Sequence, residues 1–183
     1  MAKQYSTIEP PLRDFIERQH IFFVASAAQG ARVNVSPRST DCLRVIDERS
    51  ICYLDRTGSG NETMAHLRAD GRLTVMLCAF KGPPRILRLY GKGRSILRGT
   101  EDYDRLLASQ FGTEPLGARQ IVVLAVDLVQ TSCGYGVPLF DYEGERDSMD
   151  RWAEAKIADD ALDAYQREKN TQSIDGLPTG MFD

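Results

Sequence analysis

The chain has 183 residues, of which 42% are apolar and 27% charged, with a formal net charge of −3. This composition is that of an ordinary folded domain, and the lack of a basic excess argues against broad electrostatic attraction to nucleic acid or anionic lipid. No apolar run has the length of a membrane span, about 20 residues, or the form of a signal peptide. We therefore expect one domain over residues 1–183 in the cytoplasm, without a membrane or nucleic-acid partner.

The first part of the chain predicts a short helix and then several strands. Three apolar residues recur at helical spacing after a Pro-Pro pair, so a helix is expected over residues 10–20. Runs rich in Val, Ile, Phe and Tyr follow at 21–27, 31–36, 42–48 and 50–55. These runs predict consecutive antiparallel strands, and Pro37 places the second of them at a sheet edge or a bulge.

The second part alternates helices with longer strands. A Gly/Ser loop leads into a helix that begins at about Asn61 and closes at Gly71, and another helix is expected over residues 101–112. Strands are expected at 72–80, 84–97 and 119–132. A last helix is expected to run from about Ser148 to residue 170, before a polar tail.

Six or seven strands with singly inserted helices, and no regular βαβα alternation, favour a mainly β (α+β) antiparallel barrel over a doubly wound sheet. Closing such a barrel requires strong curvature. Gly91 and Gly93 permit a bend in the strand over residues 84–97.

The segment TGSGNET, residues 57–63, has features of an anion site. Its glycines let backbone amides point inward, and the start of a helix favours negative charge. The alternative is an ordinary turn in which Asn61 caps the helix. Arg38, next to Pro37, would supply positive charge to a phosphate in this loop, unless it is a solvated arginine on a turn.

The chain has four cysteines without CxxC spacing, namely Cys42, Cys52, Cys78 and Cys133. Three of them lie in apolar runs that indicate strands, so buried free thiols are expected. Cys133 has neither a base nor a strong positive charge beside it in the sequence, which favours a structural thiol. His20 and His66 are isolated, so we expect no metal site and no Ser or Cys hydrolase.

Four segments, in their order and spacing, resemble the flavin-binding proteins related to pyridoxamine 5'-phosphate oxidase. They are NVSPRS (34–39), YLDRTGSGNETMAHL (53–67), PRILRLYGKGR (84–94) and VQTSCGYGVPLFDYEGERD (129–147). The resemblance covers roughly residues 8–155. It implies an antiparallel split β-barrel with peripheral helices that forms a homodimer with flavin mononucleotide (FMN) at the subunit interface.

Carried over by position, the resemblance implies two sets of cofactor-binding residues and a substrate side. The residues at the edge of the isoalloxazine ring would be Val35, Ser36 and Pro37. Those around the ribityl phosphate would be Arg38, Ser59, Gly60, Asn61 and Thr63. Cys133 and Tyr135 would lie on the substrate side, with Tyr135 as a stacking residue.

The chain also departs from the oxidase pattern. Asn61, Glu62 and Thr63 stand where the oxidase carries a Ser-Arg-Lys run, and Ile86 stands near its flavin-contacting Gln. The oxidase's C-terminal Arg/His segment has no counterpart in residues 151–170. The resemblance therefore implies a branch of the family distinct from the oxidase itself.

The activity implied is that of an FMN-dependent oxidoreductase acting on an unidentified small molecule, in which the cofactor carries the redox chemistry and no side chain need act as nucleophile. One alternative is a non-catalytic protein that stores or senses flavin. Another is a relative that binds a deazaflavin or haem in the same cleft, although the paucity of histidines disfavours haem.

Overall fold

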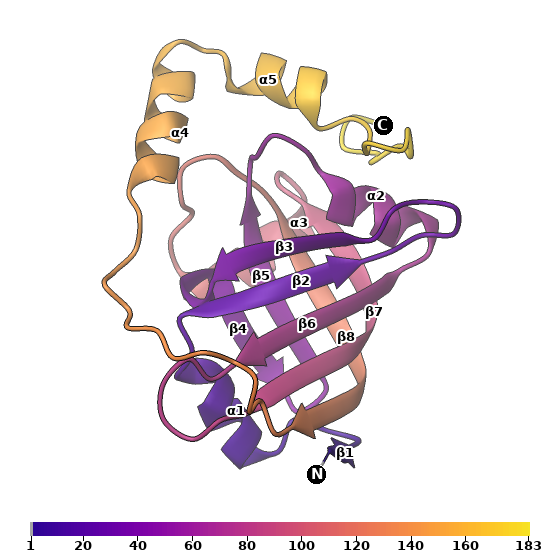
Figure 1. Cartoon of the computed structure of the whole chain (residues 1–183). Coiled ribbons are helices and arrows are strands. Elements are labelled where there is room, and N and C mark those ends of the chain that lie inside the picture. Colours follow the sequence, from indigo (N-terminus) through magenta and orange to yellow (C-terminus); the bar gives the residue numbers. More distant parts are fainter. Residues whose placement is uncertain (1) are drawn as a thin grey trace.

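The computed structural model describes residues 2–183, and its centre is an eight-stranded antiparallel sheet that curls into a half-barrel (Figure 1). The strand order is β3-β2-β6-β7-β8-β5-β4, and β1 pairs with β8. The strands are β1 (Lys3–Tyr5), β2 (Ile21–Ser26), β3 (Asn34–Ser39), β4 (Leu43–Asp47), β5 (Ser50–Arg56), β6 (Arg72–Cys78), β7 (Ile86–Leu97) and β8 (Ala118–Ser132). The α-helices are α1 (Pro10–Glu17), α2 (Glu62–Ala69), α3 (Glu101–Leu106), α4 (Ser148–Ala158) and α5 (Leu162–Lys169).

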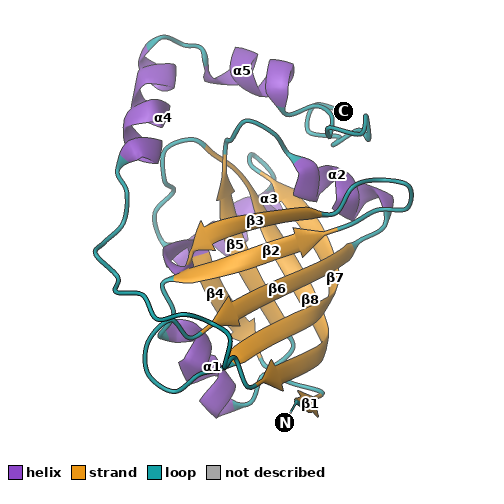
Figure 2. Ribbon diagram, viewed as in Figure 1, coloured by secondary structure: helices purple, strands orange, loops and turns teal. Residues whose placement is uncertain are grey.

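Figure 2 shows helices at both ends of the barrel. Helix α1 and the N-terminus lie at one end, and α2, α4, α5 and the C-terminus lie at the other. A short 3₁₀ turn (Thr40–Cys42) joins β3 to β4, and a π-helical turn (Leu107–Phe111) extends α3. The prediction of an antiparallel split barrel with singly inserted helices is confirmed. Within residues 2–183, no helix combines the length and apolar character needed to cross a membrane.

Two clusters of buried side chains hold the sheet in its curled shape. The larger cluster contains Ile51 and Tyr53 of β5, together with the apolar face of α1, and the smaller one contains Cys52 and Leu54. Because alternate residues of a strand point to opposite faces, β5 is buried on both sides. This position in the sheet explains why any polar side chain of β5 must find its partners inside the protein.

The bend predicted in the longest hairpin lies at Gly91. The register between β7 and β8 shifts between Tyr90 and Gly91, which is the mark of a bulge. A Cβ atom on Gly91 would lie 1.9 Å from the carbonyl oxygen of Ala125, so only glycine fits this close approach of two backbones. The long strands can therefore cross the whole barrel and still curve around it.

The predicted single C-terminal helix is wrong. The segment forms two helices, α4 and α5, because the chain turns between them and Asp160 adopts a left-handed conformation with φ of 51°. Residues 170–183 then fold back beside α2, where the bridge between Gln172 and Pro178 closes a small loop (Figure 1). The polar tail expected from the sequence is thus a packed part of the structure, with Asn170, Ser173 and Thr179 buried.

Candidate functional site

A cavity of about 750 Å³ opens at the end of the barrel that carries α2. Its walls come from β3, from the loop between β5 and α2, and from the C-terminal segment. The residues that line it are Arg32, Val33, Asn34, Ser36, Pro37, Arg38, Arg56, Gly58, Ser59, Gly60, Glu62, Thr63, Arg119, Met149, Lys169, Gln172, Ser173 and Ile174. Segments that are far apart in the sequence therefore meet in one polar, mainly basic cavity.

The structure brings most of the predicted cofactor-binding residues together here. Those that line the cavity are Ser36, Pro37, Arg38, Ser59, Gly60 and Thr63. The side chain of Asn61 is buried beneath it, whereas Val35 is 60% exposed and does not line it. Cys133 and Tyr135 follow the end of β8, while the cavity residue Arg119 lies at its start, so they sit at the opposite end of the barrel of the same chain.

A buried ion cluster forms the floor of the cavity. One oxygen of Asp55 lies 2.6 Å from Nη1 of Arg38, and the other accepts hydrogen bonds from Nε of Arg119 at 2.8 Å and Nε2 of Gln120 at 2.7 Å. The side chains of Asp55 and Arg119 are only 1% and 4% exposed. Two guanidinium groups thus share one carboxylate, which leaves a net positive charge beside the start of α2.

The arginines determine the charge state of Asp55. Burial alone would raise the pKa of its carboxyl, but Arg119 and Arg38, with the Gln120 amide, outweigh burial and hold the pKa below its ordinary value. For Arg38 the balance is similar, because burial lowers its pKa and the attraction of Asp55 more than restores it. Asp55 and Arg38 are therefore ionised at neutral pH.

Helix α2 begins as predicted, but Asn61 does not act as its side-chain cap. Within the described chain the Asn61 side chain makes no capping hydrogen bond. Its amide oxygen instead accepts from Nε2 of Gln120 at 3.0 Å, and its amide nitrogen donates to Sδ of Met64 at 3.2 Å. The side chain of Asn61 therefore ties the loop to the buried ion cluster and leaves the first turn of α2 without a side-chain cap.

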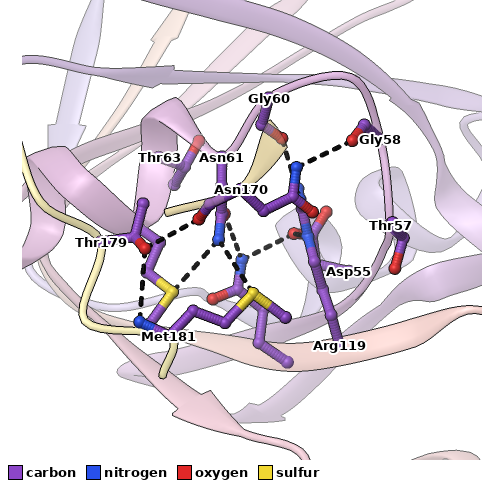
Figure 3. Close-up of polar contacts among 12 residues, drawn as sticks. Asp55, Thr57, Gly58, Gly60, Asn61, Thr63, Arg119, Asn170, Thr179 and Met181 are labelled. Carbon is purple, nitrogen blue, oxygen red and sulfur yellow. Dashed lines mark hydrogen bonds and ion pairs between the residues drawn. The ribbon is translucent and has the colours of Figure 1, made fainter. Parts of the chain in front are cut away.

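The C-terminal segment holds the same loop from the other side (Figure 3). Nδ2 of Asn170 donates to the carbonyl of Gly58 at 3.0 Å, and its Oδ1 accepts from Nη1 of Arg119 at 2.8 Å. The same Nη1 donates to the carbonyl of Gly60, also at 2.8 Å. Asn170 and Arg119 thus fix two carbonyls of the Gly/Ser loop, which directs the loop's conformation at the cavity wall.

The apolar face of edge strand β3 points to solvent, although the apolar face of a strand is normally buried. Asn34, Ser36 and Arg38 point inward and are partly buried, whereas Val35 and Pro37 are exposed. Among the described strands β3 pairs with β2 alone, which confirms the edge position that Pro37 indicated. An exposed apolar face on an edge strand is typical of a surface that a ligand or another subunit covers.

Sequence reasoning did not identify Asp55, Arg119, Gln120 or Asn170 as site residues. The available signal was the position of the first three, since these charged and amide side chains stand at the ends of runs that otherwise indicate buried strands. Asn170 carried no such signal, because it lies in a segment whose composition indicates only a polar tail.

The four thiols fall into two groups. Cys52 and Cys78 are buried and Cys42 is partly buried, and burial raises the pKa of Cys42 and Cys52 to about 12. Cys133, for which the sequence indicated a structural thiol, is exposed, and the backbone N–H of Tyr135 lowers its pKa.

We expect a thiol reagent such as dithionitrobenzoate to modify one cysteine of the folded chain rapidly at pH 7.5, because exposure and thiolate fraction control thiol reactivity. Replacing Cys133 with Ser should abolish this fast phase, and replacing Cys52 with Ser should leave it unchanged. Rapid release of two or more equivalents from the folded wild type would contradict this assignment.

The sequence is similar to a protein family and to one of its members. A family model described as "Pyridoxamine 5'-phosphate oxidase" matches residues 8–133. The "Pyridoxamine 5'-phosphate oxidase family protein ustO" of Aspergillus flavus is 37% identical over 190 residues, covering 95% of this chain and 76% of that protein.

Solved structures share the fold at low identity. A putative pyridoxamine 5'-phosphate oxidase from Lactobacillus delbrueckii has a TM-score of 0.53 and 14% identity, over 68% of this chain and 94% of its own. A single-residue variant of HupZ from group A Streptococcus also has a TM-score of 0.53, with 15% identity over 68% of this chain and 99% of its own.

Proposed function

Because the chain belongs to the pyridoxamine 5'-phosphate oxidase family, we propose that it is a flavoprotein that holds FMN in the cavity beside α2 and acts as a flavin-dependent oxidoreductase. The resemblance seen in its motifs is thereby confirmed at the level of the family.

The observation that carries the proposal is the ion cluster around Asp55. Two guanidinium groups for one carboxylate leave about one unit of positive charge at the cavity floor, and both arginines line the cavity. Nε of Arg38 is buried and has no hydrogen-bond partner among residues 2–183. An unpartnered donor and the uncapped start of α2 together suit the phosphate of FMN.

Among residues 2–183, Glu62 is the one acidic side chain that lines the cavity, and a bond to the C-terminal segment limits its repulsion of an anion. Its two carboxylate oxygens accept a hydrogen bond from the backbone N–H of Ile174 at 3.0 and 3.1 Å. This donor in the C-terminal segment partly compensates the negative charge of Glu62. The oxidase pattern has a basic residue at this position, and this difference supports an activity other than oxidation of pyridoxamine 5'-phosphate. The substrate that we propose is therefore a small molecule other than pyridoxamine 5'-phosphate.

The exposed face of β3 supports a site completed by a second subunit. Val35 of β3 is 60% exposed next to the cavity residues of the same strand, and Val33, which precedes β3 and lines the cavity, is 70% exposed. A flavin ring and a second copy of the chain would cover this surface, and the loop with Cys133 and Tyr135 would then approach the site from the partner subunit. The proposed assembly is a homodimer with each site drawn from both chains.

When bound, the flavin would supply the electron transfer, and the protein would supply binding and orientation. Arg38 and the first turn of α2 would hold the phosphate, while Ser36 and Pro37 would contact the ring edge. The buried Asp55 keeps both arginines in fixed positions, so little reorganisation is needed on binding.

The first experiment is an absorption spectrum of the purified protein, with any cofactor released by heat and identified by mass spectrometry. FMN near one per subunit supports the proposal, and a colourless protein that also fails to bind added FMN contradicts it. Reduction of the bound flavin by NADH or NADPH would separate an oxidoreductase from a protein that only stores or senses flavin.

Replacing Arg38 with Ala should weaken FMN binding by about 10- to 100-fold, because a charge-assisted hydrogen bond to the phosphate is worth about 1.5 to 3 kcal/mol. Riboflavin, which lacks the phosphate, should lose less than about threefold on the same reasoning. Arg119 still neutralises Asp55 in this variant, so the fold should persist. Fluorescence quenching of each flavin gives both affinities.

The matched control is Arg72→Ala on β6, which removes an exposed arginine paired with Asp70. It should change neither affinity. Equal weakening of FMN and riboflavin by Arg38→Ala would place the phosphate elsewhere.

A further inference from the structure

A chain of hydrogen bonds connects the cavity with a buried histidine that does not line it. Oγ of Ser36 donates to Oδ1 of Asn34 at 3.3 Å. Nδ2 of Asn34 donates to Oγ1 of Thr63 at 3.2 Å and to Oγ of Ser26 at 3.3 Å. Oγ of Ser26 lies 3.0 Å from Nδ1 of His66. Strands β2 and β3 and helix α2 are thus joined by one polar network.

This network is enclosed at its inner end and open at its outer end. His66 and Ser26 are 1% and 2% exposed, and Nε2 of His66 is buried without a partner among the described residues. Ser36, Asn34 and Thr63 line the cavity. The donor or acceptor role of His66 therefore sets the roles of the groups at the cavity wall, since buried polar chains have few alternative arrangements.

The direction of these bonds depends on the tautomer of His66. Ser26 accepts a bond from Asn34, so its own hydroxyl proton is available for Nδ1 of His66. A neutral imidazole with its proton on Nε2 accepts that bond, whereas a proton on Nδ1 would place two donors on Ser26 and favour a reversed Asn34 amide. With the proton on Nε2 of His66, Ser36 donates to Asn34 and offers lone pairs to the cavity, and Thr63 accepts from Asn34 and can donate its own hydroxyl proton.

We propose that His66 is a positioning residue, which acts through Ser26 and Asn34 to present Ser36 as an acceptor and Thr63 as a donor to the bound molecule. This inference rests on the proposed function, because it assigns the polar contacts of the same cavity. The matching ligand group carries both a donor and an acceptor, as an imide edge or a chain of hydroxyls does. Flavins contain both groups.

The first test is the protonation state of His66 in the full chain, read from the ¹⁵N shifts of the imidazole nitrogens. The chain has two histidines, so a His20→Gln variant assigns the signals. We expect the imidazole proton on Nε2. A proton on Nδ1 would reverse the chain and overturn the proposal whether or not the protein binds flavin.

The second test compares two variants in FMN binding by fluorescence quenching. His66→Leu fills similar volume without an acceptor, and His66→Asn keeps a carbonyl oxygen near the position of Nδ1. We expect about tenfold weaker binding for Leu, which corresponds to the loss of one hydrogen bond, and a change within about threefold for Asn. Urea unfolding of both variants reports their stability separately.

Equal affinities for both variants and the wild type would overturn the positioning role, and so would equal weakening that follows the loss of stability. If the wild type itself binds no FMN, the proposed function fails, and the imidazole spectrum still decides the direction of the chain.

Discussion

Replacing Asp55 with Asn is expected to lower the free energy of unfolding by about 3 to 5 kcal/mol, the cost of breaking a buried ion pair from one side. The variant keeps the volume and one acceptor, but it leaves Arg38 and Arg119 with no counter-charge in a nearly closed environment. Urea denaturation of the purified chain, followed by circular dichroism, measures the difference.

Two further variants distinguish a charge effect from general damage. Asp163→Asn removes an exposed carboxylate paired with Arg167 on α5, and such a pair is worth about 0.3 to 0.5 kcal/mol. Adding Arg38→Met to Asp55→Asn removes one of the two uncompensated charges and should recover part of the loss. No recovery in the double variant, or a loss below about 1 kcal/mol in Asp55→Asn, would contradict a stabilising role of the carboxylate.

The pH dependence of stability follows with a definite sign. Because the pKa of Asp55 is lowered in the folded protein, its carboxylate stabilises the fold above the unfolded value of about 3.9. That contribution is lost as the pH falls through the lower folded pKa. The wild type should therefore lose stability more steeply below about pH 4 than Asp55→Asn, which unfolding curves measured between pH 2 and pH 7 would show.

The barrel was predictable because its signals are local. Period-two apolar runs, turn residues and Pro37 indicated antiparallel strands and an edge, and Gly91 indicated the bend that the backbone contact with Ala125 requires. The C-terminal helix was predicted too long because its apolar stripe continues through Asp160. A left-handed aspartate in a turn has no strong local signature, unlike a glycine at the same place.

The candidate site was predictable only in part. Both segments that meet at the cavity were identified, because NVSPRS and TGSGNET carry turn and anion-binding signals of their own. Asp55 and Arg119 are 64 positions apart, and their pairing depends on the register of β5 with β8, which no local pattern gives. The same holds for Asn170, whose partners lie on a different strand and loop.

The C-terminal segment should matter for the cavity as much as the barrel does. Replacing Asn170 with Ala removes the acceptor of Arg119, in a buried bond, and the donor to the Gly58 carbonyl, in a partly buried one. We expect a loss of about 2 to 4 kcal/mol in the free energy of unfolding, since one charged donor and one carbonyl lose their partners. Hydrogen exchange should also become faster in residues 57–61, which Asn170 holds in place.

Thr171→Ala is the matched control for this variant, because the neighbouring hydroxyl makes one exposed bond to the Arg167 carbonyl. It should change stability by less than about 0.5 kcal/mol and leave exchange in the loop unchanged. If FMN binds as proposed, Asn170→Ala should weaken FMN more than riboflavin, because the loosened loop is the one assigned to the phosphate. Unchanged loop exchange in Asn170→Ala would show that Arg119 alone fixes the loop, through its bond to the Gly60 carbonyl.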